Sequence, residues 1–262
     1  MEIIIYFLIF IMGTLFGSFF SLAVYRIPLK QSIMHGRSYC PKCNHKLGFF
    51  DLIPVFSYIL LGGKCRYCKE RIRGRYIYLE ILSGIAFLLF AMSLKINLYN
   101  LDLSKLIYLV FGILFISTLF IIGGIEKENH SISNSVLLFG LILETIYIIY
   151  LYILKISIYK YAIYLFLILI LEIVNIIVLK RKGKECYPAQ NLILCSYIAI
   201  FIREELVIVS IIFTLLLVAI KEMIIGKKTK KNIVETEKGI VPIGFYLCYL
   251  NIIMLILQNY IF

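Results

Sequence analysis

Four cysteines form the clearest chemical pattern in this sequence of 262 residues. Cys40 and Cys43 make one Cys-x-x-Cys pair, and 21 residues later Cys65 and Cys68 make a second. Two such pairs at this separation are a strong zinc signature. Each pair is expected to form a tight turn with inward-pointing thiolates, and four thiolates complete a closed tetrahedral site. We therefore predict one zinc ion per chain, bound by these four side chains.

The surroundings of the four cysteines agree with a metal in a reducing compartment, where disulfides are rare. Five nearby basic residues would offset the charge of a tetrathiolate zinc: Lys42, Lys46, Lys64, Arg66 and Lys69. A loop of about 50 residues with few core residues gains folding free energy from a metal. A redox pair or unliganded thiols are the alternatives. Cys186, Cys195 and Cys248 lie in or near apolar segments, where we expect them to be small apolar fillers.

The rest of the chain has the composition of a membrane protein. Apolar residues make up 62% of the sequence, charged residues 16%, and the mean hydropathy is +0.96. An ordinary globular enzyme is therefore excluded, and no nucleic-acid partner is expected, because Lys and Arg occur in short blocks between apolar runs. A spanning helix needs roughly 20 apolar residues. We predict an all-α polytopic fold with eight spans: 3–25, 76–94, 106–125, 135–154, 161–179, 187–202, 206–225 and 243–262.

The distribution of basic residues predicts the orientation of these spans. If the loop 26–75 is cytosolic, the segments on its side hold 22 of the 27 Lys and Arg residues: 26–75, 126–134, 180–186 and 221–242. The positive-inside rule then places both termini outside the cytosol. The expected organisation is a first transmembrane helix over 1–25, a cytosolic zinc-binding loop domain over 26–75, and a transmembrane helical domain over 76–262.

The cysteine loop and its flanks resemble the type IV prepilin peptidases, bacterial leader peptidase/N-methyltransferases. The resemblance is nearly continuous over 13–84. It rests on Gly17-Ser18-Phe19, Tyr25-Arg26-Ile27-Pro28, the Ile53-Pro54 stretch between the cysteine pairs, and Arg75-Tyr76 followed by Glu80. Near the other end, 240–246 resembles the family's last Pro- and Gly-containing stretch. Ser21 is a small departure, because many members carry Asn there.

The resemblance implies a membrane aspartyl protease of the bacterial plasma membrane. Such an enzyme cuts the basic leader from type IV prepilins or pseudopilins at the cytosolic face, and then methylates the new N-terminus with S-adenosylmethionine. Two aspartates carry the proteolysis. One carboxylate activates water while the other, protonated, polarises the scissile carbonyl. No Gly-x-Gly-x-x-Gly loop occurs here, so S-adenosylmethionine enters only through the resemblance.

The family's first catalytic aspartate has a glutamate as its counterpart. The family pattern Asp-x-x-x-x-x-Ile-Pro-Asp/Asn aligns with 126–134, which puts Glu126 on the Asp, Ser133 on the Pro and Asn134 on the last position. The carboxylate is kept but has one extra methylene. A displacement of about 1 Å can cost roughly a hundredfold in rate. Alternatively, Glu126 and Glu128 simply end a span at the lipid headgroups.

The second catalytic aspartate has no clear counterpart, because no Gly-Asp pair occurs in the chain. Aligning on the helix start at Leu192 puts Pro188 on the motif's second Gly and Ala189 on the Asp, which breaks the dyad. A gapped alternative puts Glu185 on the Asp, but that acid in a Lys-rich loop is also explained as a solvated charge. We favour Ala189 as the counterpart and keep Glu185 as the candidate catalytic acid.

Three further acids lie within predicted spans, where a carboxylate is costly and often functional. Glu144 is too far along its span to complete a dyad with Glu126, and Glu172 has no assigned role. Glu80 matches an acid of the family motif, and we expect it to pair with a basic residue of the cysteine loop. Three functions follow from these residues. They are a working prepilin peptidase, a member that has lost proteolysis but keeps methyl transfer or prepilin binding, and a zinc-clamped membrane scaffold in a pilus or competence machine.

Overall fold

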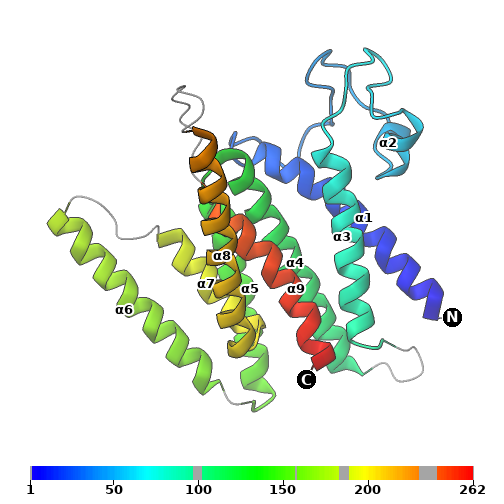
Figure 1. The fold of residues 1–262 in the computed structure, drawn as a ribbon. Coiled ribbons are helices and arrows are strands. Elements are labelled where there is room, and N and C mark those ends of the chain that lie inside the picture. The colour runs from blue at the N-terminus through cyan, green and yellow to red at the C-terminus, as the bar shows by residue number, and fades with distance from the viewer. Residues whose placement is uncertain (1, 97–101, 157, 183–188, 230–240, 262) are drawn as a thin grey trace. The chain divides into compact units, whose positions relative to one another are not determined.

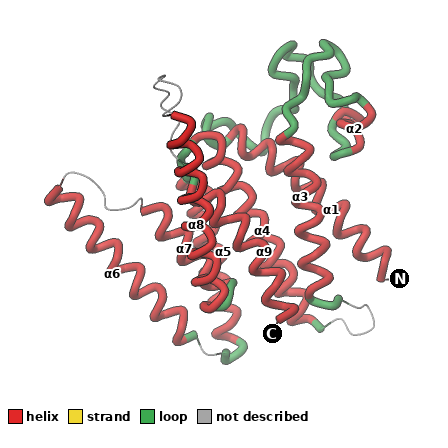
Figure 2. Tube along the Cα trace, in the orientation of Figure 1, coloured by secondary structure: helices red, strands yellow, loops and turns green. Residues whose placement is uncertain are grey.

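Helices provide the regular structure throughout the part of the chain that a computed structural model describes, residues 2–96, 102–156, 158–182, 189–229 and 241–261 (Figure 1). Figure 2 shows helices joined by loops, and the described residues contain no strand. The elements are α1 (Glu2–Arg26), η1 (Phe49–Asp51), α2 (Phe56–Leu60), α3 (Arg75–Ser93), α4 (Leu103–Asn129), α5 (Asn134–Ile153), α6 (Tyr159–Lys182), α7 (Ala189–Phe201), α8 (Glu204–Thr229) and α9 (Ile243–Ile261).

Within the described ranges, the eight helices α1 and α3 to α9 coincide with the eight predicted spans to within four residues at each end. Among the described residues, six are long and apolar enough to cross a membrane: α1, α3, α4, α5, α8 and α9. The sixth predicted span is a shorter apolar helix, Gln190–Phe201 within α7. The all-α polytopic fold is therefore confirmed, and the number of eight crossings remains a prediction. The largest differences, of four residues, are at the ends of α4 and α8, and α4 continues to Asn129 so that it carries Glu126 within the helix rather than after it.

The chain forms two compact units, Met1–Gly124 and Ile125–Phe262. The first holds α1, the cysteine loop with η1 and α2, then α3 and most of α4. The second holds the end of α4 and the helices α5 to α9. The predicted division into 1–25, 26–75 and 76–262 follows membrane topology and remains a prediction.

In the first unit, α1 and α3 pack at very short range. A Cβ atom on Gly17 would lie 2.1 Å from Ser83 Oγ, and one on Gly13 would lie 2.8 Å from Gly84 Cα. Ser83 Oγ donates a hydrogen bond to the Gly13 carbonyl at 2.8 Å. Gly-x-x-x-Gly spacing lets two membrane helices approach closely and gain dispersion energy, because lipid supplies no hydrophobic driving force between them. This contact places the two helices that flank the cysteine loop side by side.

Aromatic side chains from α1, α3 and α4 pack together in the first unit. Phe20 stacks on Phe120 with ring centroids 5.9 Å apart and meets Phe87 edge-on at 6.5 Å. Phe87 is fully buried. Aromatic pairs at these separations contribute beyond their buried area. They tie α4 to the α1–α3 pair within this unit.

In the second unit, α7 is the central helix and packs against α5, α6, α8 and α9. Its Phe201 ring stacks on Tyr147 of α5 with centroids 4.8 Å apart. Gln258 of α9 donates from Nε2 to the Phe201 carbonyl at 3.2 Å and accepts from the Arg203 amide at 3.3 Å. These two bonds satisfy backbone groups where α7 ends and α8 begins.

Candidate metal centre and candidate active site

The two cysteine pairs form two turns with the same hydrogen bonds, 25 residues apart. In the first, the Cys40 amide donates to the His45 carbonyl at 3.0 Å and the Asn44 amide donates to the Cys40 carbonyl at 2.8 Å. In the second, Cys65 and Lys69 repeat these bonds at 2.8 and 3.0 Å. Asn44 and Lys69 both have positive φ, 55° and 61°, which turns the chain after each second cysteine. Each pair therefore directs both sulfurs to one point.

The sulfur positions fit a tetrahedral metal. All four Sγ atoms lie within 4.8 Å of one another, and Cys40 Sγ is 3.8 Å from Cys68 Sγ. Zn–S bonds of about 2.3 Å in a tetrahedron require sulfurs about 3.8 Å apart. Cys40 and Cys65 are buried, whereas Cys43 and Cys68 face solvent. The predicted ligand set is brought together, and this cluster could hold a metal ion.

The crowding of the sulfurs separates the thiol pKa values. Burial raises the pKa of Cys40, but the amide N–H groups of Cys43 and Lys42 outweigh it and bring it to about 7. The Glu70 amide lowers the pKa of Cys68, but lost solvation and the neighbouring sulfurs outweigh it and raise it to about 12. Four thiolates this close repel one another unless a cation lies between them. A metal cation held by the cluster would compensate this repulsion.

Arg26 and Glu80 fasten the cysteine loop to the two helices that flank it. The Arg26 side chain is 7% exposed, and its guanidinium donates to the carbonyls of Ser32, His35 and Arg37 at 2.9, 3.1 and 3.4 Å. Glu80 Oε2 accepts the Val55 amide at 2.7 Å. The predicted pairing of Glu80 with a basic residue of the cysteine loop is therefore wrong. The glutamate binds the loop through a backbone N–H, because the chain that follows Ile53-Pro54 lies against α3 at the position of Glu80.

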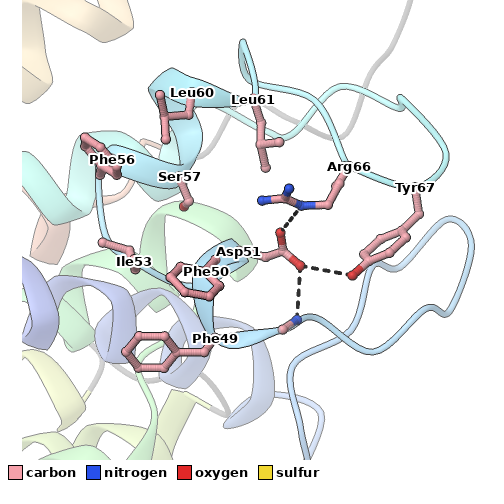
Figure 3. Close-up of a pocket in the computed structure, with 11 residues that line it drawn as sticks. Phe49, Phe50, Asp51, Ile53, Phe56, Ser57, Leu60, Leu61, Arg66 and Tyr67 are labelled. Carbon is pink, nitrogen blue, oxygen red and sulfur yellow. Dashed lines mark hydrogen bonds and ion pairs between the residues drawn. The ribbon is translucent and has the colours of Figure 1, made fainter.

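Asp51 joins the two halves of the loop (Figure 3). Its carboxylate accepts from Arg66 Nε at 2.6 Å, from the Gly48 amide at 3.0 Å and from the Tyr67 hydroxyl at 3.3 Å. Its side chain is only 5% exposed. Burial raises the pKa of Asp51, but the bonds from Arg66 and Gly48 outweigh it and hold the pKa below the ordinary 3.8. Sequence reasoning missed this residue, which no short motif marks.

Glu126 lies in the last turn of α4 and touches the first turn of α9. It is 7% exposed, and its Oε1 accepts the Gly244 amide at 3.0 Å. The neighbouring Phe245 amide also donates to this carboxylate. A Cβ on Gly244 would lie 2.4 Å from Oε2, so only glycine admits the carboxylate here. The other oxygen, Oε2, is buried and has no hydrogen-bond partner among the described residues. Carboxylates are commonly stabilised at helix N-termini, so Glu126 also has a structural role.

The first turn of α7 lies beside the start of α5. Gln190 Nε2 donates to Asn134 Oδ1 at 2.8 Å. Asn134 closes the pattern that begins at Glu126, and Gln190 follows Ala189, the favoured counterpart of the second aspartate. This bond brings the two predicted motif regions together within the second unit. No sequence signal indicated the pairing of Asn134 with Gln190.

The structure describes only some of the remaining residues that the sequence singles out. The described residues do not include Glu185, Cys186 and Pro188, nor the side chain of Glu172. Glu144 is 3% exposed in α5, and its Oε2 has no hydrogen-bond partner in the described part of the chain.

Comparison with known proteins gives a family for the N-terminal part. The family model described as "Bacterial Peptidase A24 N-terminal domain" matches residues 11–94. A "Prepilin leader peptidase/N-methyltransferase" of Myxococcus xanthus is 40% identical over 79 residues, 30% of this chain and 24% of that protein. The protein of the same name from Vibrio cholerae is 38% identical over 89 residues, 31% and 35% of the two chains. That from Bacillus subtilis is 34% identical over 132 residues, half of each chain.

The match to the family model covers the cysteine cluster, Arg26 and Glu80. The chain spans between about a quarter and a half of the length of these curated relatives. No solved structure matches it significantly. The resemblance over 13–84 is confirmed. Residues 11–94 of this multi-pass membrane protein thus match the bacterial peptidase A24 N-terminal domain, and the chain is similar in part to proteins named prepilin leader peptidase/N-methyltransferase.

Proposed function

We propose that the chain processes type IV prepilins or pseudopilins at the cytosolic face of the bacterial plasma membrane. The observation that carries this proposal is the cysteine cluster, which has zinc geometry and lies inside the segment shared with proteins named prepilin leader peptidase/N-methyltransferase. Zinc bound by Cys40, Cys43, Cys65 and Cys68 would stabilise the loop between α1 and α3. The basic loops face the cytosol and both termini face outside, as the charge distribution indicates.

Glu126 is the proposed first acid of the peptidase. Its burial at the end of α4, beside the α9 amides, gives the carboxylate a fixed position. Oε2 is the oxygen that remains to act on a water molecule or on the scissile carbonyl. A glutamate reaches one methylene further than the family's aspartate, so the reacting oxygen is displaced.

The second acid decides how active the peptidase is. The Gln190–Asn134 bond supports the register in which Ala189 occupies the second motif position. An alanine supplies neither a proton nor a charge, so the dyad would be incomplete and proteolysis weak. Glu185 is the alternative second acid, and its use would require the segment before α7 to bring it to Glu126.

The missing Gly-Asp pair favours a second candidate function. In this second candidate function the chain binds prepilins without cutting them. It then either methylates their N-termini with S-adenosylmethionine or acts as a zinc-clamped scaffold. The test is co-expression of the full chain with a prepilin from the same genome, followed by mass spectrometry of the pilin N-terminus. A shortened and methylated N-terminus indicates the complete reaction. Methylation of an externally trimmed pilin indicates the transferase alone. An unchanged pilin that co-purifies with the chain indicates the scaffold.

A further inference from the structure

The cysteine loop exposes an apolar patch on its η1–α2 segment. The patch consists of Phe49, Phe50, Phe56, Ile59 and Leu60, which are 80, 73, 58, 65 and 69% exposed. We propose that this patch is a membrane anchor, which inserts into the boundary between headgroups and acyl chains of the leaflet from which α1 and α3 emerge. Its partner is an anionic lipid surface. The proposal requires only that α1 and α3 cross a membrane, and is independent of prepilin processing.

The depth of the patch is the first argument. Val55, which immediately precedes α2, is held by the bond from its amide to Glu80 Oε2 at 2.7 Å. Glu80 lies five residues inside α3, about 7.5 Å along a helix that rises 1.5 Å per residue. Figure 1 shows α2 beside the upper part of α3, with the two cysteine turns further out. Interfacial segments bury their apolar faces about 5–10 Å into the boundary region, so the patch lies at the depth that an anchor needs.

The backbone at Val55 is built around this contact. Val55 has φ 62° and ψ −51°, and the Phe56 amide donates to the Pro54 carbonyl at 2.6 Å, which closes a γ-turn. A positive φ is costly for a β-branched residue, and such turns persist where their surroundings hold them. The Glu80 carboxylate is that support. The turn redirects the chain so that Phe56, Ile59 and Leu60 follow on α2 at the side of α3.

The charge distribution is the second argument. Residues 47–61 contain no Lys or Arg and a single acid, Asp51, which pairs with Arg66. The complete loop 26–75 carries eleven Lys and Arg against two acids. The patch is therefore free of uncompensated charge, whereas the chain around it is strongly basic. Apolar side chains flanked by basic residues are typical of segments that bind anionic membrane surfaces.

A peptide groove is the competing reading of the same surface. A cavity of about 450 Å³ lies between η1, α2 and the turn that carries Arg66 and Tyr67 (Figure 3). Peptides bound in extended form rely on main-chain hydrogen bonds to their groove. The acid in this cavity, Asp51, is already bonded to Arg66, Tyr67 and the Gly48 amide. The lining thus suits lipid better than a peptide main chain.

The chain contains no tryptophan, so a single introduced Trp reports on the patch alone. The full chain carrying Phe50→Trp, and separately Leu60→Trp, is reconstituted into phosphatidylcholine vesicles with and without phosphatidylglycerol. We expect emission at shorter wavelength, protection from iodide, and loss of fluorescence with lipids brominated near the glycerol end of the acyl chain. The control Lys42→Trp, on the exposed turn between Cys40 and Cys43, should remain open to iodide and escape the brominated lipids. Metal content checks that each variant is folded.

Two further variants test the depth argument. In the Phe50→Trp chain, Glu80→Ala removes the acceptor for the Val55 amide and should reduce quenching by brominated lipid, whereas Glu80→Gln keeps an acceptor oxygen and should not. Both patch tryptophans remaining open to iodide in both vesicle types, with intact metal content, would overturn the proposal. Protection that appears only when a prepilin peptide is added would assign the patch to a peptide instead.

Discussion

The amide of Gly244 donates a hydrogen bond to Glu126 Oε1 at 3.0 Å, which joins the end of α4 to the start of α9. The two residues are 118 positions apart in the sequence. Glu126 is thus placed by the first turn of α9, which lies in the stretch where the sequence predicts a second resemblance to the prepilin peptidases. The same contact gives Glu126 a structural function, whatever its part in chemistry.

Replacing Gly244 by alanine tests this contact. The new Cβ would meet Glu126 Oε2 at 2.4 Å, so α9 or the carboxylate must move. We expect a loss of stability of about 1–3 kcal/mol, the usual cost of disrupting a buried polar contact. The measurement is thermal unfolding in detergent. Gly48→Ala is the control, because its Cβ would lie 3.5 Å from the nearest atom. Equal unfolding temperatures for Gly244→Ala and the unmodified chain would show that the contact carries no stability.

The metal centre makes a separate prediction. The purified chain should contain one zinc, and Cys40→Ser should lose it, because three thiolates leave the tetrahedral site incomplete. Cys195→Ser is the matched control, since Cys195 lies on α7 outside the cluster. Elemental analysis measures the metal, and protease digestion reports the loosened loop. An unmodified chain with no zinc and four freely titrating thiols would refute the site.

The sequence predicts those parts of this protein that depend on local spacing. Apolar runs locate the long helices. The spacing of Cys40, Cys43, Cys65 and Cys68 identifies a cluster whose four sulfur atoms lie close together in the structure. Contacts between distant residues could not be read in this way. No periodicity links Glu126 to Gly244 or Asn134 to Gln190, because these pairs form only when separate helices pack. Glu80 was correctly related to the loop, but its partner is a backbone amide, which sequence patterns do not reveal.

Membrane topology can be checked with introduced cysteines. Asn129→Cys and Thr229→Cys should be labelled from the cytosolic side, because 22 of the 27 basic residues fall on that side of the predicted spans. Lys155→Cys, on the opposite side, should be labelled only from outside. Labelling is compared with that of the unmodified chain to subtract native thiols. Labelling of positions 129 and 229 from opposite faces would mean that the number of spans between them is odd.

The ion pair of Asp51 predicts a dependence on pH. Its folded-state pKa is held below 3.8, so the stabilisation is complete above that value and is lost as the pH falls through the folded pKa. The difference in unfolding temperature between the unmodified chain and Asp51→Asn, with zinc in excess, should therefore stay constant from pH 7 to about pH 4. A difference that already grows as the pH falls from about 6 to 5 would mean that the pKa of Asp51 is raised in the folded chain.

The most direct test of the proposed catalytic residues is leader cleavage of a prepilin that is co-expressed with the chain. Cleavage in the membranes is followed by the mobility of the prepilin on a gel. The unmodified chain should cleave weakly or not at all, because a missing acid–base partner commonly costs about 10²–10⁴-fold. The combined variant Glu126→Asp, Ala189→Asp and Pro188→Gly should recover part of the activity, since it restores both acids and the glycine before the second one. Robust cleavage by the unmodified chain that Glu185→Gln abolishes and Ala189→Asp leaves unchanged would contradict the assignment of Ala189 and make Glu185 the second acid.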